Sequence, residues 1–320
     1  MMLHRLRFIP GRLAQSIPVA FGVTLMVFLM ARLLPGNAAM AILGQRATDA
    51  SVAALSEQLG LNKPLWEQYV LFLGRLVRGN LGSSLTYQIP VTDLLTQAIP
   101  VTLSLLGLAL AISLIISVPL AALAASRPSG PRDLGVRVFT LLGQGMPQFW
   151  LGIMLIMLLA VGWHVFPVGG YGTSAAEHPY YLFLPALTLA IAMCPTIIRS
   201  LRSSMINVLE SEYVGTARSK GSYGVALFRD HVLRNAAIPT VSVIGVNLGY
   251  LVGGSLVIEK VFALPGLGSL MINAIFTRDF PTIQGVTLFV ALFVVVVGIL
   301  TDVVYTLLDP RVSFSGEEQS

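Results

Sequence analysis

Stretches of mainly apolar residues long enough to cross a lipid bilayer recur along this chain of 320 residues. A transmembrane helix needs about 20 such residues to cross a hydrocarbon core about 30 Å thick. Only 11% of the residues are charged, whereas a soluble domain carries about 25% charged residues. The sequence therefore predicts an all-α integral membrane protein with six transmembrane helices, at about 17–34, 99–125, 138–163, 181–198, 236–258 and 284–308.

The first apolar run could instead be the core of a signal peptide. Arg5, Arg7 and Arg12 precede it, and the segment 39–41, Ala-Met-Ala, offers a cleavage site. Signal-peptide cores usually have about 7 to 15 apolar residues, and this run is longer. We therefore expect a retained first transmembrane helix.

Basic residues near the ends of the runs predict the orientation, because they stay on the cytoplasmic side. With the N-terminus inside, the two short outer loops hold only Lys260 and Arg278. The predicted inner segments hold the other basic residues near the runs: Arg5, Arg7, Arg12, Arg127, Arg132, Arg137, Arg199, Arg202, Arg218, Lys220, Arg229, Arg234 and Arg311. We expect a multi-pass membrane protein with both termini cytoplasmic.

Residues 35–98 are of mixed polarity, in contrast to the runs on either side. Apolar residues recur there at the spacing of an amphipathic helix, at Leu65, Tyr69, Phe72, Leu73 and Leu76. We expect an external subdomain between the first and second transmembrane helices. In a later outer loop, Ser269 is a candidate N-cap for a short helix over 269–278.

The one long polar insert between apolar runs covers residues 203–235. Helical spacing predicts one helix over 203–219, which Gly221 ends in a left-handed turn. Ser222 is a candidate N-cap for a second short helix. The pattern alone leaves two interpretations open, a solvated basic loop and a segment that faces a partner protein.

The insert contains a recognisable motif. The run Tyr213-Val-x-Thr-Ala-Arg-x-Lys-Gly221, followed by His-x-Leu-Arg-Asn-Ala at 231–236, resembles the ATPase-docking loop, the EAA motif, of ABC-importer permeases in its peptide-permease variant. Only Ala217 and Gly221 match the general Glu-Ala-Ala-x-x-x-Gly motif strictly, because Gly215 and Thr216 stand at its first two positions. Further similarity to dipeptide and oligopeptide permeases lies at 80–85, 146–152, 184–187, 259–268 and 308–311.

The resemblance implies the fold of a type I ABC-importer transmembrane domain, divided into three parts. Residues 1–97 would form the first transmembrane helix and the extracytoplasmic subdomain. Residues 98–309 would form a five-helix core that contains the cytoplasmic coupling loop 203–235, and residues 310–320 a cytoplasmic tail. The resemblance assigns ATPase coupling to Glu212, Tyr213, Thr216, Ala217, Arg218, Lys220, Gly221, His231 and Arg234.

The resemblance also implies a bacterial cell (inner) membrane as the location, the function and the partners. The chain would be half of the translocation path for short peptides that an external binding protein delivers, beside a second homologous permease and two ATPase subunits. Similar permeases carry nickel, glutathione or other small solutes, so the substrate stays open. This chain would bind no cofactor, and ATP and Mg²⁺ would sit on the ATPase partners.

Motifs of catalysis are missing from the sequence. It contains no Gly-x-x-x-x-Gly-Lys-Ser/Thr phosphate loop and no His-Glu-x-x-His metal site. Its one cysteine, Cys194, lies in an apolar run and is expected to be a buried small side chain. We therefore expect no catalytic residue, no metal and no enzyme activity, which leaves a membrane-anchored enzyme without support.

Polar residues within the second to fifth predicted helices are candidates for the walls of a path, because polar side chains in a span usually point away from lipid. They are Ser104, Ser113, Gln144, Gln148, Thr188, Asn247 and Ser255. Hydrogen bonds between helices would explain the same residues without a path. A self-sufficient secondary transporter or channel is the rival hypothesis, but only Asp302 is an ionisable residue well inside a predicted span.

Overall fold

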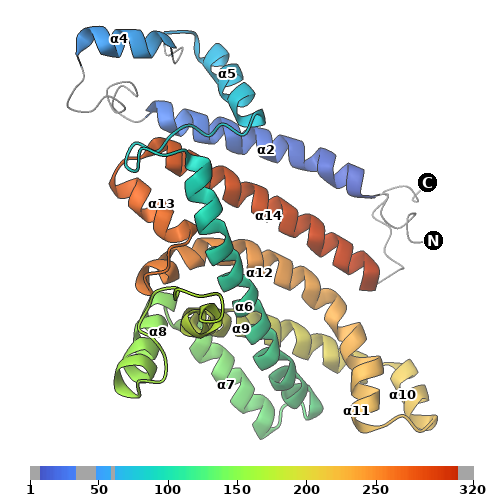
Figure 1. Ribbon diagram of the computed structural model, residues 1–320. Helices are drawn as coiled ribbons and strands as arrows, with labels where there is room; N and C mark the ends of the chain where they lie inside the picture. The colour runs from blue at the N-terminus through green and yellow to red at the C-terminus, as the bar shows by residue number, and fades with distance from the viewer. Residues whose placement is uncertain (1–7, 34–47, 59–61, 309–320) are drawn as a thin grey trace, which may run out of the picture.

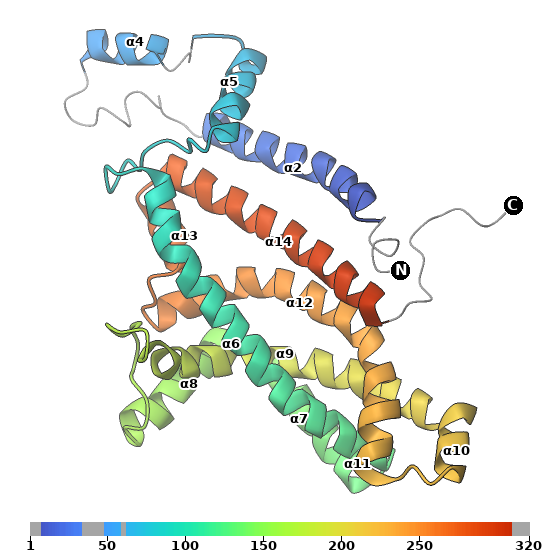
Figure 2. The ribbon, with the colours of Figure 1, turned by 45° about the vertical axis from the view of Figure 1, so that its right-hand side comes forward.

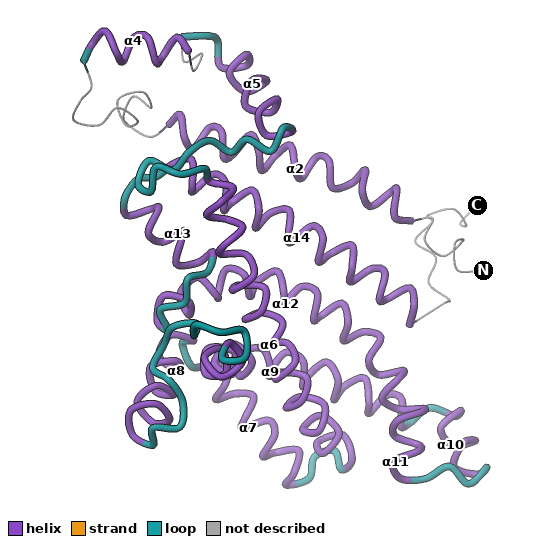
Figure 3. Tube along the Cα trace, in the orientation of Figure 1, coloured by secondary structure: helices purple, strands orange, loops and turns teal. Residues whose placement is uncertain are grey.

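The computed structural model describes residues 8–33, 48–58 and 62–308, and this part of the chain is built of helices joined by loops (Figure 3). Residues 1–7, 34–47, 59–61 and 309–320 lie outside it. The helices are, in chain order, α2 (Phe8–Leu33), α4 (Asp49–Gln58), α5 (Leu65–Val77), α6 (Val91–Ser126), α7 (Pro131–Gly145), α8 (Gln148–Leu155), η2 (Ile156–Gly162), α9 (His178–Leu209), α10 (Glu212–Ser219), α11 (Gly224–Leu227), η3 (Phe228–Leu233), α12 (Arg234–Val261), α13 (Leu267–Phe276) and α14 (Phe280–Leu308).

The long helices pack side by side, with α9 against both α6 and α12, and α14 between α12 and α2 (Figures 1 and 2). Small residues of α6 such as Ala109 and Ala121 are fully buried and let α9 approach closely. Cys194 of α9 is completely buried, which confirms the expectation for this residue. The main core therefore lies where α6, α9 and α12 meet.

Four helical segments of the described chain are long and apolar enough to cross a membrane: α6, α9, the continuous segment Gly224–Val261, and α14. These correspond to the second, fourth, fifth and sixth predicted spans. The apolar part of α2 that the structure describes, Ala14–Leu29, is shorter. Its role as the first of six spans stays a prediction.

The third predicted span, 138–163, is not one straight helix. It divides into α7 and the segment Gln148–Gly162, which meet at an angle of 103°. Met146, between them, has an extended backbone with φ −90° and ψ 127°. The cause is Pro147, because a proline disfavours helical geometry in the preceding residue and lacks the N–H that a continuous helix would use.

Helix α5 in the predicted external region packs against α2. The ring of Tyr69 lies at 5.3 Å from the ring of Phe28, and its hydroxyl is 2.8 Å from Oγ1 of Thr24. The predicted amphipathic helix is thereby confirmed. Helix α6 begins at Val91 and not near residue 98, so the core helix reaches further into this region than hydropathy indicates.

Three predicted helix boundaries are wrong. The helix expected over 203–219 breaks at Glu210 and Ser211, where Ser211 has an extended backbone and starts α10. The next helix has Tyr223 as its N-cap, and not Ser222. Helix α13 begins after Gly266, and not at Ser269, because side chains from other helices accept the hydrogen bonds of its first N–H groups.

Candidate functional site

The predicted coupling loop projects from one end of the bundle, beyond the ends of α9 and α12 (Figures 1 and 2). It consists of α10, a turn at Lys220–Tyr223, and the short α11 that continues through η3 into α12. The loop is thus continuous with α12 through α11 and η3, and it is joined to α9 through Glu210 and Ser211. A displacement of α10 or α11 can therefore reach two of the predicted spans.

The turn after α10 has the two backbone hydrogen bonds of a Schellman motif. The N–H of Gly221 donates to the carbonyl of Arg218 at 3.0 Å, and the N–H of Ser222 donates to that of Ala217 at 3.0 Å. Gly221 has φ +87°, which confirms the predicted left-handed turn. A Cβ on Gly221 would meet no atom within 4 Å. Glycine is therefore favoured here by the positive φ and not by a lack of space for a side chain.

A small hydrophobic core holds the loop together. Val214 and Ala217 of α10 pack with Leu227 of α11, and Val208 at the end of α9 covers them. Ala217 is only 9% exposed. The methyl group of Ala217 thus packs inside the loop, and its part in ATPase coupling stays a prediction.

The other predicted coupling residues form the outer surface of the loop. Those that are exposed are Glu212, Tyr213, Thr216, Arg218, Lys220, Gly221 and Arg234. His231 is half-buried, and its carbonyl accepts a hydrogen bond from Nδ2 of Asn235 at 2.7 Å. The predicted coupling residues therefore present polar and basic side chains near the exposed ring of Tyr213.

Sequence reasoning missed two apolar residues on this surface. Tyr223 is 67% exposed and Val225 is 81% exposed. Large apolar side chains this accessible are suited to a contact with another protein. Their position directly after the glycine turn was the available signal, but spacing alone does not tell an exposed apolar residue from a buried one.

Most of the predicted path residues form hydrogen bonds within their own helices. Side chains of Ser113, Thr188, Asn247 and Ser255 donate to carbonyls three or four residues earlier, at 2.7–3.0 Å. Three of these residues, Ser113, Thr188 and Ser255, are buried. Such bonds satisfy a polar group inside a helical bundle without a partner helix.

The remaining path candidates lie elsewhere. Ser104 of α6 and Gln144 of α7 are exposed. Gln148, the first residue of α8, lies close against α12, since a Cβ on Gly254 would stand 2.8 Å from its Oε1. The structure thus places Gln148 beside Gly254 of α12. The role of the candidate residues in a path stays a prediction.

A buried carboxylate that sequence reasoning missed connects three helices. Glu259 of α12 is fully buried and accepts hydrogen bonds from Thr102 Oγ1 at 2.7 Å, from the N–H of Gly268 at 2.7 Å and from the N–H of Ser269 at 3.2 Å. Thr102 Oγ1 in turn accepts the N–H of Leu267 at 2.9 Å. Residues from α6 and α12 together cap the N-terminus of α13, whose first N–H groups have no partner within the helix.

A second buried carboxylate lies at the end of the bundle that carries the loop. Asp133 of α7 is 1% exposed and forms a bidentate ion pair with Arg202 of α9, at 2.5 and 2.8 Å. Arg137 approaches the same carboxylate at 2.8 Å, and the N–H of Ser129 donates to it at 3.0 Å. Arg202 lies seven residues before the end of α9, so this pair anchors the root of the coupling loop to α7.

Asp279 plays a similar part before α14. Its carboxylate accepts hydrogen bonds from the hydroxyls of Ser84 and Thr282 and from the N–H of Leu85. It thereby holds the segment before α6 against the start of α14. In each case at least one partner is distant in sequence, Thr102 for Glu259, Arg202 for Asp133 and Ser84 for Asp279, which is why neither periodicity nor a local motif indicated the contact.

Two family models match the chain over most of its length. Residues 117–314 match the model described as "Binding-protein-dependent transport system inner membrane component". Residues 5–106 match the model of the N-terminal part of such membrane components. The second match covers α2, the external region and the start of α6.

Relatives that align with nearly the whole chain carry the names of peptide permeases. The chain is 35% identical to the oligopeptide transport system permease protein AppB of Bacillus subtilis, over 96% of this chain and 99% of that protein. It is 37% identical to the probable peptide ABC transporter permease protein y4tP of Sinorhizobium fredii, with the same coverage of 96% and 99%. A solved structure of the MetNI methionine ABC transporter in inward-facing conformations matches 68% of this chain and 96% of that chain, with a TM-score of 0.55 and 18% identity. This structural likeness concerns the fold alone.

Proposed function

Since the chain belongs to the family of binding-protein-dependent transport system inner membrane components, we propose that it is one of two permease subunits of an ATP-driven importer for short peptides. Two observations support the peptide substrate: relatives 35–38% identical over nearly the whole chain carry the names of peptide and oligopeptide permeases, and the motif around Gly221 has the peptide-permease form. Nickel, glutathione or another small solute is the alternative substrate.

The geometry of the coupling loop carries the mechanism. Its outer surface is exposed, its own core holds it in shape, and it continues without a break into η3 and α12. When two ATPase subunits close around ATP, they move a loop that is docked between them. Val208 transmits this movement to α9, and η3 transmits it to α12. The chain itself breaks no bond; ATP and Mg²⁺ belong to the ATPase subunits.

The root of the loop is stiffened by the ion pair between Asp133 and Arg202. This pair ties α9 to α7, so that a displacement of the loop carries both helices together. Interactions between packed, rigid elements are the means by which coupling travels through a protein. We assign to Asp133 and Arg202 a positioning role, which keeps the loop and the helix pair α7–α8 in one moving unit.

The proposed arrangement in the membrane follows the distribution of basic residues. The loop and both termini face the cytoplasm, and α4, α5 and α13 face outward. The outward side receives an external substrate-binding protein, and α4 and α5 contribute to that contact. A second, homologous permease completes the path between the two subunits, and Gln148, which is half-buried at the start of α8, is the candidate on this chain to line it.

Reconstitution tests this function directly. The complete complex with its binding protein is placed in proteoliposomes, and uptake of a labelled dipeptide, a labelled tetrapeptide, glutathione and Ni²⁺ is measured with and without ATP. We expect ATP-dependent and binding-protein-dependent uptake of peptides. Uptake of Ni²⁺ or glutathione alone would replace the peptide assignment, and solute flux through this chain without ATP would favour a self-sufficient transporter or channel.

A further inference from the structure

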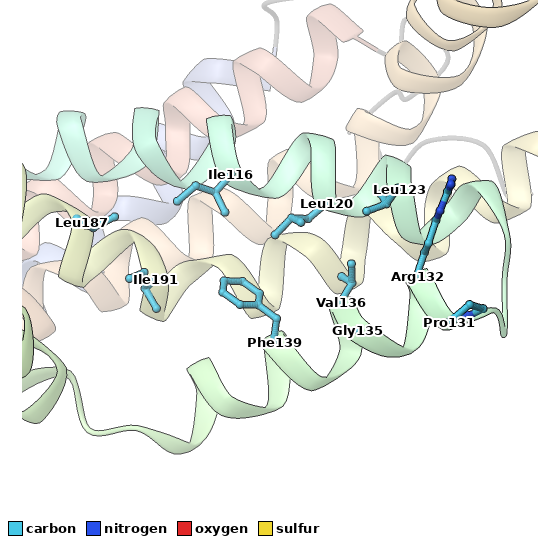
Figure 4. A pocket seen from close by; sticks show the side chains of 10 residues that line it. All are labelled: Ile116, Leu120, Leu123, Pro131, Arg132, Gly135, Val136, Phe139, Leu187 and Ile191. Carbon is cyan, nitrogen blue, oxygen red and sulfur yellow. The ribbon is translucent and has the colours of Figure 1, made fainter.

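An apolar groove opens between α6, α7 and α9, with a volume of about 590 Å³ (Figure 4). Half-buried side chains form its walls, among them Leu120 of α6, Phe139 of α7 and Ile191 of α9. Arg132 stands at the end of the groove beside the turn that joins α6 to α7, and Leu187 lies toward the other end (Figure 4). The groove is thus apolar along its length and basic at one end.

The charge of Arg132 is available to a ligand. This side chain is exposed, and within the described part of the chain it takes part in no ion pair, whereas the nearby Arg137 and Arg202 both bind Asp133. Seven residues of α6 separate Leu123, beside Arg132, from Ile116 further along the groove, a distance of about 10 Å at 1.5 Å per residue. The apolar walls therefore run well into the predicted span.

The geometry points to a binding site for one anionic phospholipid, with its phosphate at Arg132 and one acyl chain along Leu120, Phe139 and Ile191. The inference rests on the orientation proposed above, which puts the turn 127–130 at the cytoplasmic surface. Basic pockets between transmembrane helices on this side suit anionic headgroups. The lipid would fill the space between α7 and α9 and support the angle between α7 and α8.

A lipid explains the groove better than the second permease does. A homologous permease carries its own basic residues at the same membrane surface, so its docking here would bring like charges together, which costs free energy. An anionic phosphate complements Arg132, and an acyl chain adapts to an irregular apolar wall. The groove therefore favours a lipid as its occupant.

Two variants and two matched controls test the site. Arg132→Gln removes the charge, with Arg127→Gln as its control, because Arg127 is also exposed in the same turn region but does not line the groove. Gly135→Leu fills the groove, since a Cβ at Gly135 meets no atom within 4 Å. Gly107→Leu is its control, a helical glycine of α6 with equally open space outside the groove.

The complete complex is reconstituted in nanodiscs that contain equal amounts of phosphatidylglycerol and phosphatidylcholine. The complex is then released from the nanodiscs, and native mass spectrometry measures how much lipid the complex retains. We expect one retained phosphatidylglycerol for each copy of this chain. Arg132→Gln should lower its retention about fivefold relative to phosphatidylcholine, Gly135→Leu should abolish it, and both controls should keep it.

Equal retention of phosphatidylglycerol by the wild type, Arg132→Gln and Gly135→Leu would overturn the inference. Loss of the second permease from the Gly135→Leu complex, with no lipid retained by the wild type, would also overturn it and assign the groove to the subunit interface. Because lipid retention is measured without transport, the result is independent of whether the substrate is a peptide.

Discussion

Replacement of Glu259 tests whether a carboxylate from α12 holds α13 in place. Glu259→Ala removes the acceptor of three hydrogen bonds, from the Thr102 hydroxyl and from the N–H groups of Gly268 and Ser269. A buried donor left without a partner costs about 1–3 kcal/mol. Ser269 is only partly buried and regains some hydration, so we expect a total loss of about 3 kcal/mol in the local stability of the α13 N-terminus.

Glu259→Gln is the graded variant, because glutamine has the same length and keeps one acceptor oxygen. Its NH₂ group, however, must face at least one of the donors that the carboxylate accepts. We expect a loss of about 1–2 kcal/mol, roughly the value of one hydrogen bond to a charged group. The matched control is Glu177→Ala, since Glu177 is exposed and accepts hydrogen bonds from Thr173, four residues earlier in the same loop region.

Hydrogen exchange read out by mass spectrometry measures the effect on the purified complex. A peptide that contains Gly268 and Ser269 should exchange fastest in Glu259→Ala, more slowly in Glu259→Gln and slowest in the wild type, with local changes of about 100-fold and 10-fold. The Glu177→Ala variant should match the wild type in this peptide. If both Glu259 variants keep wild-type protection, the capping network does not stabilise α13.

Three further predictions concern the base of the loop, the topology and the docking surface. Asp133→Ala should lower the temperature at which the complex loses its monodisperse peak in size-exclusion chromatography, because the substitution leaves Arg202 without its buried partner. Arg137→Gln should have little effect, since that arginine is 53% exposed. Equal shifts for the two variants would contradict the positioning role. A cysteine at Glu57 should react with a reagent that does not cross the membrane when it is added outside, and labelling only from the cytoplasm would reverse the topology. Arg218→Glu should weaken assembly with the ATPase more at low salt than at high salt, because exposed charges are screened over about 10 Å at 0.1 M; an effect independent of salt would contradict electrostatic steering by Arg218.

Features that depend on local sequence could be predicted. Hydropathy located α6, α9, α12 and α14, because a bilayer requires a long apolar run whatever its neighbours are. The left-handed turn at Gly221 was also predictable, since a glycine directly after a helix indicates this conformation by itself. These features need no knowledge of tertiary contacts.

Features that depend on contacts distant in sequence could not be predicted. The angle at Met146–Pro147 has a local cause, the proline, but the run is apolar on both sides of it and hydropathy gives no information on the direction of a helix. The burial of Ala217 depends on Leu227, across the turn, and the burial of Glu259 depends on Thr102 in another helix. From sequence alone, a carboxylate near the end of an apolar run, such as Glu259, is interpreted as a residue at the membrane surface. Its burial is known only once its partners are known.

The central claim, that the loop around Gly221 couples the ATPase to transport, is tested most directly by Gly221→Glu. Its matched control is Gly79→Glu, because Gly79 also has a positive φ, +73°, and open space around its Cβ. The backbone strain of either change is about 1 kcal/mol, too small to prevent insertion of the bundle. ATP-dependent peptide uptake by the reconstituted complex should be abolished in Gly221→Glu and retained in Gly79→Glu, with normal abundance of both proteins. Normal uptake by Gly221→Glu with the ATPase still bound would contradict the coupling role of this loop.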